Sequence, residues 1–389
     1  MNIPYGRQHI TEEDIQAVSE VLRGDFLTQG PSIAQFEQAF ACYVGAKFAL
    51  AVSNGTTALH LAALALGVKP GTRVISTPIT FAASTNCVLY CGGEVWFADI
   101  DPDSYTLSLE KTRALLASKP KGFFSGIIPV DFAGLPVNME AFRALADEFG
   151  CWIIEDACHA PGASFKNTRN ETVHCGDGHY ADLSIFSFHP VKHIAAGEGG
   201  MITTNNEALY KQLVLLRTHG ITKDAALFQN NPEQVEQGGW YYEMQELGFN
   251  YRITDFQAAL ANSQLKRADA GLAQRQRIAE RYQYAFQHLP ILSPALSTGV
   301  QHGWHLYVIQ ADNRKALYDA LREKQIFCQV HYIPVHLQPY YQQLGWKPGD
   351  FPVAEAYYKR CLSLPMYPSL TEEQQSYVIE SVLQFFSGN

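Results

Sequence analysis

The amino-acid sequence predicts an α/β fold, in which a mostly parallel sheet is flanked by helices and followed by a smaller α/β unit. Two patterns indicate this. Short apolar runs alternate with amphipathic helical segments over the first half of the chain, which is typical of a doubly wound sheet. Small or polar residues directly follow several of these runs, as they do where ligands bind at the carboxyl ends of parallel strands. The 389 residues, 47% hydrophobic and 17% charged, are enough for a sizeable core.

Two helices are predicted before the first strand. Thr11, followed by three acidic residues, is typical of a helix N-cap with an acidic first turn, and this helix would end near Arg23. A loop rich in turn residues follows over 24–31. The segment 32–44 repeats apolar residues at helical spacing, so a second helix is expected there.

An anion-binding turn is predicted after the first strand, 48–52. The strand leads into a Ser-Asn-Gly-Thr-Thr run at 53–57, and a helix is expected over 58–66. Free backbone N–H groups and the helix dipole would face an anion there, and the hydroxyls would add donors. The run is not a Walker loop, because no GK[ST] follows it. A strand–turn–helix crossing without a ligand is the alternative for this stretch taken alone.

Other strands of the predicted sheet end in residues that carry chemistry. The strand over 152–155 runs into Asp156, and Phe81 follows the strand at 73–76. Because the carboxyl ends of parallel strands meet at one edge, these residues and Gly55 would lie together. The other predicted elements are strands at 95–98 and 126–130, and helices at 82–91, 108–117, 139–149 and 206–217.

A lysine between two strands is the centre of the predicted site. Apolar residues up to Phe188 indicate a buried strand, a short polar segment then presents Lys192, and a further strand is predicted at 201–204. Desolvation in such a loop lowers the pKa of a lysine and leaves a nucleophilic amine. The glycines that follow would let the backbone approach a planar cofactor. For a lone lysine, an ordinary surface position is the alternative.

Pyridoxal phosphate (PLP) is the cofactor whose chemistry needs these groups. The amine of Lys192 could form a Schiff base with its aldehyde. Asp156 would keep the pyridine nitrogen protonated, which makes the ring an electron sink. The turn at Gly55 and Thr56 would hold the phosphate, and Phe81 would pack against the ring. The freed lysine amine could then move a proton between two carbons.

Two long polar loops are predicted. Residues 165–180 contain His174, Cys175 and His179, which could bind zinc but in such a loop are more often solvated, so no metal is expected. Residues 221–245 contain the aromatic run Trp240, Tyr241 and Tyr242, and loops of this length tend to be functional or to lie at an interface.

The C-terminal part predicts the smaller unit, and we place a PLP-binding domain at 1–248 and a small domain at 249–389. A helix is expected after the Asn-Tyr-Arg run that begins at Asn250. The other predicted elements of this part are a long helix at 265–288, strands at 304–310 and 327–331, and helices at 314–324 and 371–386.

Charge, cysteine spacing and hydropathy disfavour several classes of protein. The formal charge of −9 disfavours a nucleic-acid partner. No apolar run is long enough to span a bilayer, and the N-terminus has no apolar signal core. The eight cysteines form no CxxC pair, which favours free thiols in a reducing compartment. We therefore expect a cytoplasmic protein without a nucleic-acid or membrane partner.

Ordered motifs along nearly the whole chain resemble the DegT/DnrJ/StrS sugar aminotransferases. The most specific are Asp156-Ala157 with His159, the SFHPVK run that ends at Lys192, and the glycine-rich run from Gly197. Weaker motifs lie at 27–30, 55–59, 250–252 and 331–332. Several motifs in the same order are far more specific than any one of them. The resemblance implies an enzyme of the aspartate-aminotransferase fold (PLP fold type I) that uses PLP.

The resemblance also implies roles around the cofactor ring. Lys192 would carry the Schiff base and move the proton, and Asp156 would pair with the pyridine nitrogen. His159 would lie near the ring hydroxyl. Phe81 would stack on the ring.

The remaining implied roles concern the phosphate and the substrate. Gly55, Thr56 and Ser187 would bind the phosphate, and Asn250 of one subunit would reach the phosphate in the other, so that a homodimer shares its sites. The residues expected to contact a nucleotide-sugar are Tyr5, Asp25, Phe26, Leu27, Thr28, Thr56, Ser187, Asn250, His331, Tyr332, Ile333 and Pro334.

The HPVKHI run around Lys192 looks closest to the pseudaminic-acid branch of the family. That branch aminates the 4-keto group of a UDP-linked 2-acetamido-4-keto-6-deoxy-hexose, usually with glutamate as donor, and we expect this reaction. Ala195 and Ala196 stand where the branch often has threonines. A sugar 3-aminotransferase, or another nucleotide-sugar aminotransferase of the family, is the alternative. Lys192 disfavours a dehydratase, and Lys192 with Asp156 disfavours a non-catalytic sugar-binding protein.

Overall fold

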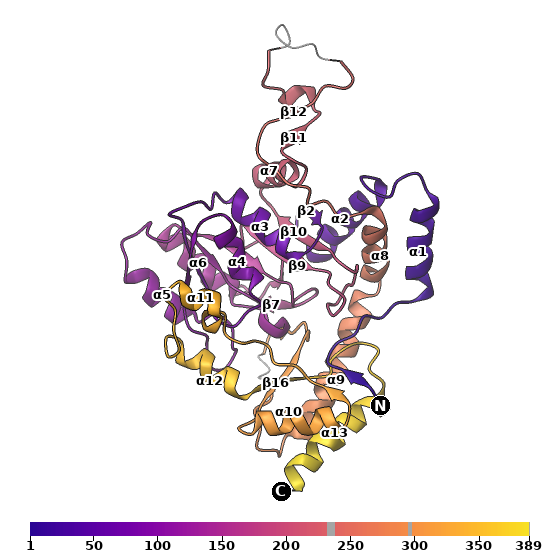
Figure 1. Ribbon diagram of the computed structural model, residues 1–389, viewed down its shortest axis with the longest axis vertical. Helices are drawn as coiled ribbons and strands as arrows, with labels where there is room; N and C mark the ends of the chain where they lie inside the picture. The colour runs from indigo at the N-terminus through magenta and orange to yellow at the C-terminus, as the bar shows by residue number, and fades with distance from the viewer. Residues whose placement is uncertain (232–237, 295–297, 389) are drawn as a thin grey trace.

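The computed structural model describes residues 1–231, 238–294 and 298–388. At its centre lies a seven-stranded sheet in the order β2–β10–β9–β6–β5–β3–β4 (Figure 1). β10 runs antiparallel to both of its neighbours, whereas the other neighbouring pairs are parallel, so the predicted mostly parallel sheet is confirmed. The strands are β2 (Phe48–Val52), β3 (Arg73–Ser76), β4 (Glu94–Phe97), β5 (Gly126–Ile128), β6 (Trp152–Asp156), β9 (Leu183–Ser187) and β10 (Gly200–Thr204).

Helices cover both faces of the sheet, because successive strand residues point to opposite sides. On β9, Leu183 and Ile185 join a core with α3, α4 and α7, whereas Phe186 joins a core with α2 and α8. Ile127 and Ile153 pack against α5 and α6 on that second face. The helices are α2 (Pro31–Val44), α3 (Gly55–Ala65), α4 (Ala83–Tyr90), α5 (Leu109–Ala117), α6 (Met139–Phe149), α7 (Glu207–Arg217) and α8 (Asp255–Leu265).

Most predicted helices begin and end within a few residues of the expected positions. In α1 (Glu12–Arg23), the backbone N–H of Thr11 donates to the Asp14 carboxylate at 3.0 Å, which confirms the capped start. α3 begins earlier than expected, because Asn54 caps it by accepting the N–H of Thr57 at 2.9 Å. The small residues of the predicted turn therefore form the first turn of the helix itself.

The predicted loop over 165–180 contains strands. β7 (Ser164–Lys166) and β8 (Thr172–His174) pair with each other, and β7 also pairs with β13 (Val300–Gln301) in a small antiparallel sheet. The expectation of a loop without regular structure was wrong there, because strands of three residues are too short for their alternation of polar and apolar residues to stand out in the sequence.

The predicted loop over 221–245 is an arm that projects from the body of the molecule (Figure 1). β11 (Ile221–Thr222) and β12 (Glu243–Met244) pair at its base. Residues 232–237 of this segment lie outside the described residues.

The C-terminal part of the chain builds a second core around two antiparallel strands, β14 (Tyr307–Gln310) and β16 (Cys361–Leu364). β1 (Ile3–Pro4) pairs in parallel with β15 (Ile326–Phe327), so the first residues of the chain join this core. The strand predicted at 327–331 is replaced by the two-residue β15, which ends at Phe327. The helices of this part are α9 (Ala268–Phe286), α10 (Arg314–Glu323), α11 (Pro339–Gln343), α12 (Pro352–Arg360) and α13 (Glu372–Ser387).

The division into residues 1–248 and 249–389 remains a prediction. α8 lies beyond residue 248, yet it packs against α1 and α2 (Figure 1). Within the described residues, no helix is both long enough and apolar enough to cross a membrane.

Candidate active site

The register of the sheet brings the ends of several strands to one edge. Gly200, at the start of β10, lies between Val52 at the end of β2 and Ser187 at the end of β9. Asp156, at the end of β6, lies beside Ile185 of β9. The predicted site residues of the large sheet therefore meet in the loops that follow these ends, as expected for parallel strands.

The turn after β2 is shaped to bind an anion. Gly55 and Thr56 open α3, and among the described residues no protein group accepts their backbone N–H groups. A Cβ added to Gly55 would lie 3.0 Å from the Cβ of Ser187 and 3.3 Å from its hydroxyl oxygen, so a larger residue would fit only if Ser187 shifted. Unpaired N–H groups at a helix N-terminus beside a hydroxyl are donors that suit a phosphate.

Asp156 is buried, and two donors hold its carboxylate. The hydroxyl of Ser84 on α4 donates to Oδ2 at 2.6 Å, and the backbone N–H of Cys158 donates to Oδ1 at 3.2 Å. Each carboxylate oxygen has two lone pairs, so the group can accept a further hydrogen bond. A buried, fixed carboxylate of this kind can hold a protonated ring nitrogen.

Lys192 lies between β9 and β10, and its amine is desolvated. Desolvation is the main cause that lowers the pKa of Lys192 to about 8, and the thiol of Cys158 and the carboxylate of Asp156 oppose it. The positive charge of Arg275 adds to the lowering. With this pKa, about a tenth of the amine is uncharged at pH 7. The Nζ atom lies 3.4 Å from Nε2 of His305.

His159 is buried, and the backbone sets its tautomer. The N–H of Ala133 donates to Nδ1 at 3.2 Å, so the ring proton is on Nε2, which lies 3.3 Å from the hydroxyl oxygen of Tyr332. Burial lowers the pKa of His159 well below its usual value, and the charge of Lys192 acts in the same direction. His159 is therefore a neutral donor directed toward Tyr332.

Some of the predicted substrate residues lie beside Lys192 and His159. The rings of Tyr5 and His331 are 5.2 Å apart, and those of Phe81 and Tyr332 are 6.3 Å apart. Phe81 is 62% exposed, so its ring is free to stack. His331 is buried, its Nδ1 lies 2.8 Å from the Ser363 hydroxyl oxygen, and burial lowers its pKa to about 3. This surrounding is that of a structural histidine.

The other predicted substrate residues lie elsewhere. Residues 25–28 are exposed in the loop between α1 and α2, which bonds to α8 through the N–H of Asp255 and the carbonyl of Leu27 at 2.9 Å. Asn250 is exposed and its backbone bridges to Thr218. Ile333 is exposed, whereas Pro334 is buried. Among the described residues, no hydrogen bond joins residues 25–28 or Asn250 to Lys192.

Several residues near Lys192 and Asp156 were not singled out from the sequence. Ser84 lies one helical turn after Phe81, and this spacing could have indicated it. His305 is 113 residues from Lys192, and no local pattern joins the two. No local pattern indicates Arg275 either, because the segment that contains it has the sequence of an ordinary charged helix.

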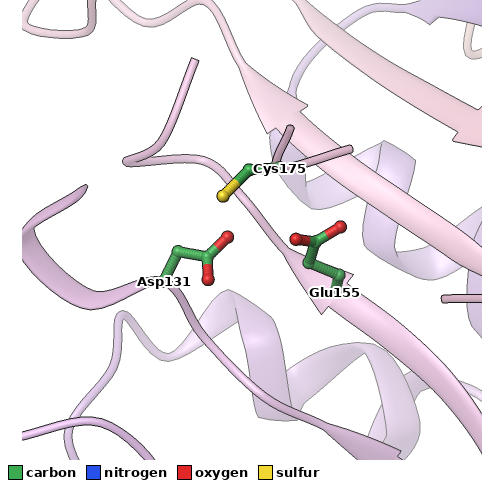
Figure 2. A group of neighbouring side chains, drawn as sticks. All are labelled: Asp131, Glu155 and Cys175. Carbon is green, nitrogen blue, oxygen red and sulfur yellow. The ribbon is translucent and has the colours of Figure 1, made fainter. Parts of the chain in front are cut away.

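Cys175, predicted to lie in a solvated loop near two histidines, turns into the core. Its sulfur and the carboxylates of Asp131 and Glu155 lie within 4.8 Å of one another (Figure 2). Burial raises the pKa of Asp131 and Cys175 well above their usual values, and that of Glu155 to about 7. Two adjacent buried carboxyl groups of this kind retain a proton between them. Glu155 points to the opposite face of β6 from Asp156, so this cluster lies behind the site.

The comparisons with known proteins agree with this geometry. The model of the DegT/DnrJ/EryC1/StrS aminotransferase family matches residues 8–383. The spore coat polysaccharide biosynthesis protein SpsC of Bacillus subtilis is 40% identical over 99% of this chain and 97% of its own length. Helicobacter pylori PseC, an aminotransferase involved in the biosynthesis of pseudoaminic acid, has a TM-score of 0.87 at 29% identity, over 100% of both chains. Spr1654 of Streptococcus pneumoniae, solved in its PLP form, has a TM-score of 0.89 at 26% identity, over 100% of this chain and 99% of its own.

The residues at the sheet edge fit PLP, which when bound supplies a conjugated ring that takes up electrons from the reacting carbon. The free N–H groups of Gly55 and Thr56 would hold its phosphate, and Asp156 its ring nitrogen. Lys192, whose amine is partly uncharged, would bind it covalently and later take and return the proton. The fold, the enzyme class and the cofactor predicted from the sequence are confirmed. The chain belongs to the DegT/DnrJ/EryC1/StrS aminotransferase family and is a PLP-dependent sugar aminotransferase.

Proposed function

We propose that the enzyme aminates the 4-keto group of a UDP-linked 2-acetamido-4-keto-6-deoxy-hexose, with glutamate as donor, in a route to pseudaminic acid. The observation that carries this proposal is the HPVKHI run, whose Lys192 is held beside His305 and near the pair formed by His159 and Tyr332. The run resembles that of the pseudaminic-acid branch. The full-length likeness to PseC, described as an enzyme of that route, supports the same assignment.

Groups beside Lys192 support a nucleotide-sugar as substrate. Tyr332 offers a hydroxyl, and the partly buried Tyr5 offers a ring surface. A diphosphate must bind a chain of formal charge −9, so positive charge has to gather locally. Arg7 is exposed and lines, together with Lys192 and Arg267, a cavity of about 280 Å³. We therefore assign Arg7 to the diphosphate.

We further propose a homodimer in which each subunit completes the site of the other. Asn250 and residues 25–28 are exposed and form no hydrogen bond to the Lys192 site of their own chain. The arm beside Asn250 exposes Trp240 and Tyr242, and exposed aromatic surface of this kind is typical of an interface. All eight cysteines are free, which supports the cytoplasmic location that we also propose.

A substrate panel tests the reaction. The purified enzyme is incubated with UDP- and dTDP-linked 4-keto and 3-keto sugars and with glutamate or glutamine, and the products are identified by mass spectrometry and NMR. We expect a single new amine at C4 of the UDP-linked 2-acetamido sugar. Preference for a 3-keto sugar would instead establish a sugar 3-aminotransferase. The 40% identity to SpsC, a protein of polysaccharide biosynthesis, is the reason to include other 4-keto sugars.

A further inference from the structure

Arg275 on α9 is a buried cation without a counter-ion among the described residues. It is 1% exposed, and its Nη1 donates to the carbonyl oxygens of Trp304 at 3.1 Å, His305 at 3.3 Å and Met366 at 3.0 Å. Its Nε has no partner. Burial of a charge without a carboxylate partner is costly, so a role for the charge itself is worth seeking.

His305 connects Arg275 to Lys192. Its carbonyl accepts from Arg275, while its ring Nε2 lies 3.4 Å from the Lys192 Nζ. The Nδ1 atom of His305 is buried and has no partner. Nδ1 is unsatisfied in either tautomer, and the tautomer with the proton on Nε2 directs that proton toward Lys192. An Nε2–H group pairs with the lone pair of an uncharged amine and repels an ammonium group.

Among the groups recorded as acting on the Lys192 amine, Arg275 is the positively charged one, and its effect adds to the larger effect of burial. Burial lowers the pKa of each neighbouring histidine below its usual value, so these rings are neutral. Asp156 and Cys158 favour the charged amine, whereas Arg275 disfavours it. Charges act strongly on one another in a buried, poorly solvated region. The groups whose charges act on the amine, or on which its charge acts, are Asp156, Cys158, His159, His193, Arg275, His305 and His331.

We propose that Arg275 is a positioning residue for Lys192: its buried charge raises the uncharged fraction of the lysine amine, and its hydrogen bonds fix the His305 backbone, whose ring lies beside that amine. The inference rests on the proposed role of Lys192, since only an uncharged amine can attach to a carbonyl or take up a proton. Arg275 touches neither the substrate nor the cofactor in this account, and acts through Lys192 and His305.

The test measures the ionisation of Lys192 directly. Full-length protein loaded with pyridoxamine 5′-phosphate, in which the lysine amine is free, is labelled with trace acetic anhydride from pH 6 to pH 11. Peptide mass spectrometry then gives the apparent pKa of Lys192. Arg275→Gln keeps hydrogen-bond donors but loses the charge, whereas Arg275→Lys keeps the charge. Arg281→Gln on the same helix, where the side chain bonds to the Glu372 carbonyl and the Ser376 hydroxyl, is the matched control.

We expect the apparent pKa of Lys192 to rise by a few tenths of a unit in Arg275→Gln, which makes the uncharged fraction roughly twofold smaller at neutral pH, because burial of the amine remains the larger cause. It should stay at the wild-type value in Arg275→Lys and Arg281→Gln. The acid limb of the pH–rate profile should move up by the same amount in Arg275→Gln alone. Equal Lys192 pKa values in Arg275→Gln and wild type would overturn the proposal.

Folding defects leave the proposal testable. If Arg275→Gln does not fold, Arg275→Lys decides, because it loses the guanidinium contacts and should unfold at a lower temperature while Lys192 keeps its low pKa. A raised Lys192 pKa in Arg275→Lys would show that contacts, and not charge, set the ionisation, and would overturn the proposal. If the cofactor proves to be attached to a lysine other than Lys192, the proposed site itself is refuted.

Discussion

Burial sets the protonation of single residues on both faces of β6 and in the loop that carries Lys192. On one side, desolvation leaves part of the Lys192 amine uncharged and keeps His159 neutral. On the other side, Glu155 and Asp131 lie together without a cationic partner among their recorded contacts, so protonation stabilises them. The same physical cause thus leaves a partly uncharged amine in the loop after β9 and a proton-sharing pair of carboxyl groups behind β6.

Replacement of Lys192 by alanine should lower transamination by roughly a thousandfold or more, because the covalent and proton-transfer steps both need its amine. In the wild type, borohydride should attach the cofactor to the peptide that contains Lys192. Absorbance and peptide mass spectrometry check both results. Lys166→Ala is the control, because that amine bonds to Thr172 in the small sheet. An Lys192→Ala enzyme with the wild-type rate would contradict the assignment.

Stability should fall as the pH rises from about 4.5 to 7, in part because of Glu155. Its pKa is raised from 4.5 to about 7 in the folded chain, so in this window the folded state binds more protons than the unfolded state. Glu155→Gln keeps an acceptor for Ser184 and Gly176 and should gain stability relative to wild type as the pH rises. Urea unfolding at pH 5 and pH 7.5 measures this. An unchanged pH dependence would show that Glu155 is not the group that titrates.

At the scale of elements, the site is made where strand ends meet helix starts. The first turn of α3 lies against the end of β9. Gly200, at the start of β10, lies between the ends of β2 and β9. A Cβ on Gly200 would lie 2.4 Å from the carbonyl oxygen of Asn54, so the close approach requires glycine there. β1 pairs with β15 and thereby places Tyr5 beside His331.

Gly55→Ala should weaken PLP binding by about tenfold or more, because the added Cβ would lie 3.0 Å from Ser187 and would crowd the free N–H groups of α3. Titration of the protein with PLP, followed by absorbance, measures the affinity. Gly271→Ala, whose Cβ would meet an atom of Pro368 at 3.6 Å, is the matched control and should bind PLP normally. Equal affinities of the two variants would mean that the phosphate lies elsewhere.

Tyr5→Ala should raise the KM for the sugar by about tenfold, since an aromatic stacking surface is lost beside the site. The half-reaction with glutamate should remain near the wild-type rate, because Tyr5 has no contact with Lys192 or Asp156 among the recorded ones. Stopped-flow absorbance of each half-reaction separates the two effects. Tyr340→Ala, at an exposed position, is the control. Equal losses in both half-reactions would show that Tyr5 contributes to cofactor binding and not to sugar binding.

At the scale of the whole molecule, the exposure of several predicted site residues fits the proposed homodimer. Residues 25–28 lie at the end of the molecule remote from α10 and α13, and the arm that precedes Asn250 projects away from the body (Figure 1). A single chain therefore brings Gly55, Asp156 and Lys192 to one edge, whereas Asn250 and residues 25–28 form no hydrogen bond to that edge among the described residues. A two-fold dimer with shared sites would resolve this arrangement.

Mixed dimers test the sharing of sites. Lys192→Ala and Asn250→Ala subunits are each expected to be inactive or nearly so. After exchange at equal amounts, half of the dimers are mixed and each has one intact site, so about a quarter of the wild-type activity should return. Activity assays with mass photometry measure rate and assembly together. No recovery despite proven exchange, or full activity in a monomer, would refute shared sites.

The sequence by itself determined the architecture and the cofactor edge. Alternation of apolar runs and amphipathic segments specifies a parallel sheet, and in such a sheet strand direction alone places Gly55, Asp156 and Lys192 at one edge. Ordered motifs were enough to indicate the family, because each has to stand at its own place in this topology. These are consequences of local patterns and connectivity.

Only the tertiary structure decided which distant groups surround those residues. It buried His331 against Ser363, turned Cys175 toward Asp131 and Glu155, and showed short polar strands within two predicted loops. It also placed His305 and Arg275 behind Lys192. Such contacts join residues that are as many as 113 positions apart. They depend on how whole elements pack, so no local spacing encodes them. The ionisation of Lys192, which its chemistry requires, is set by that packing.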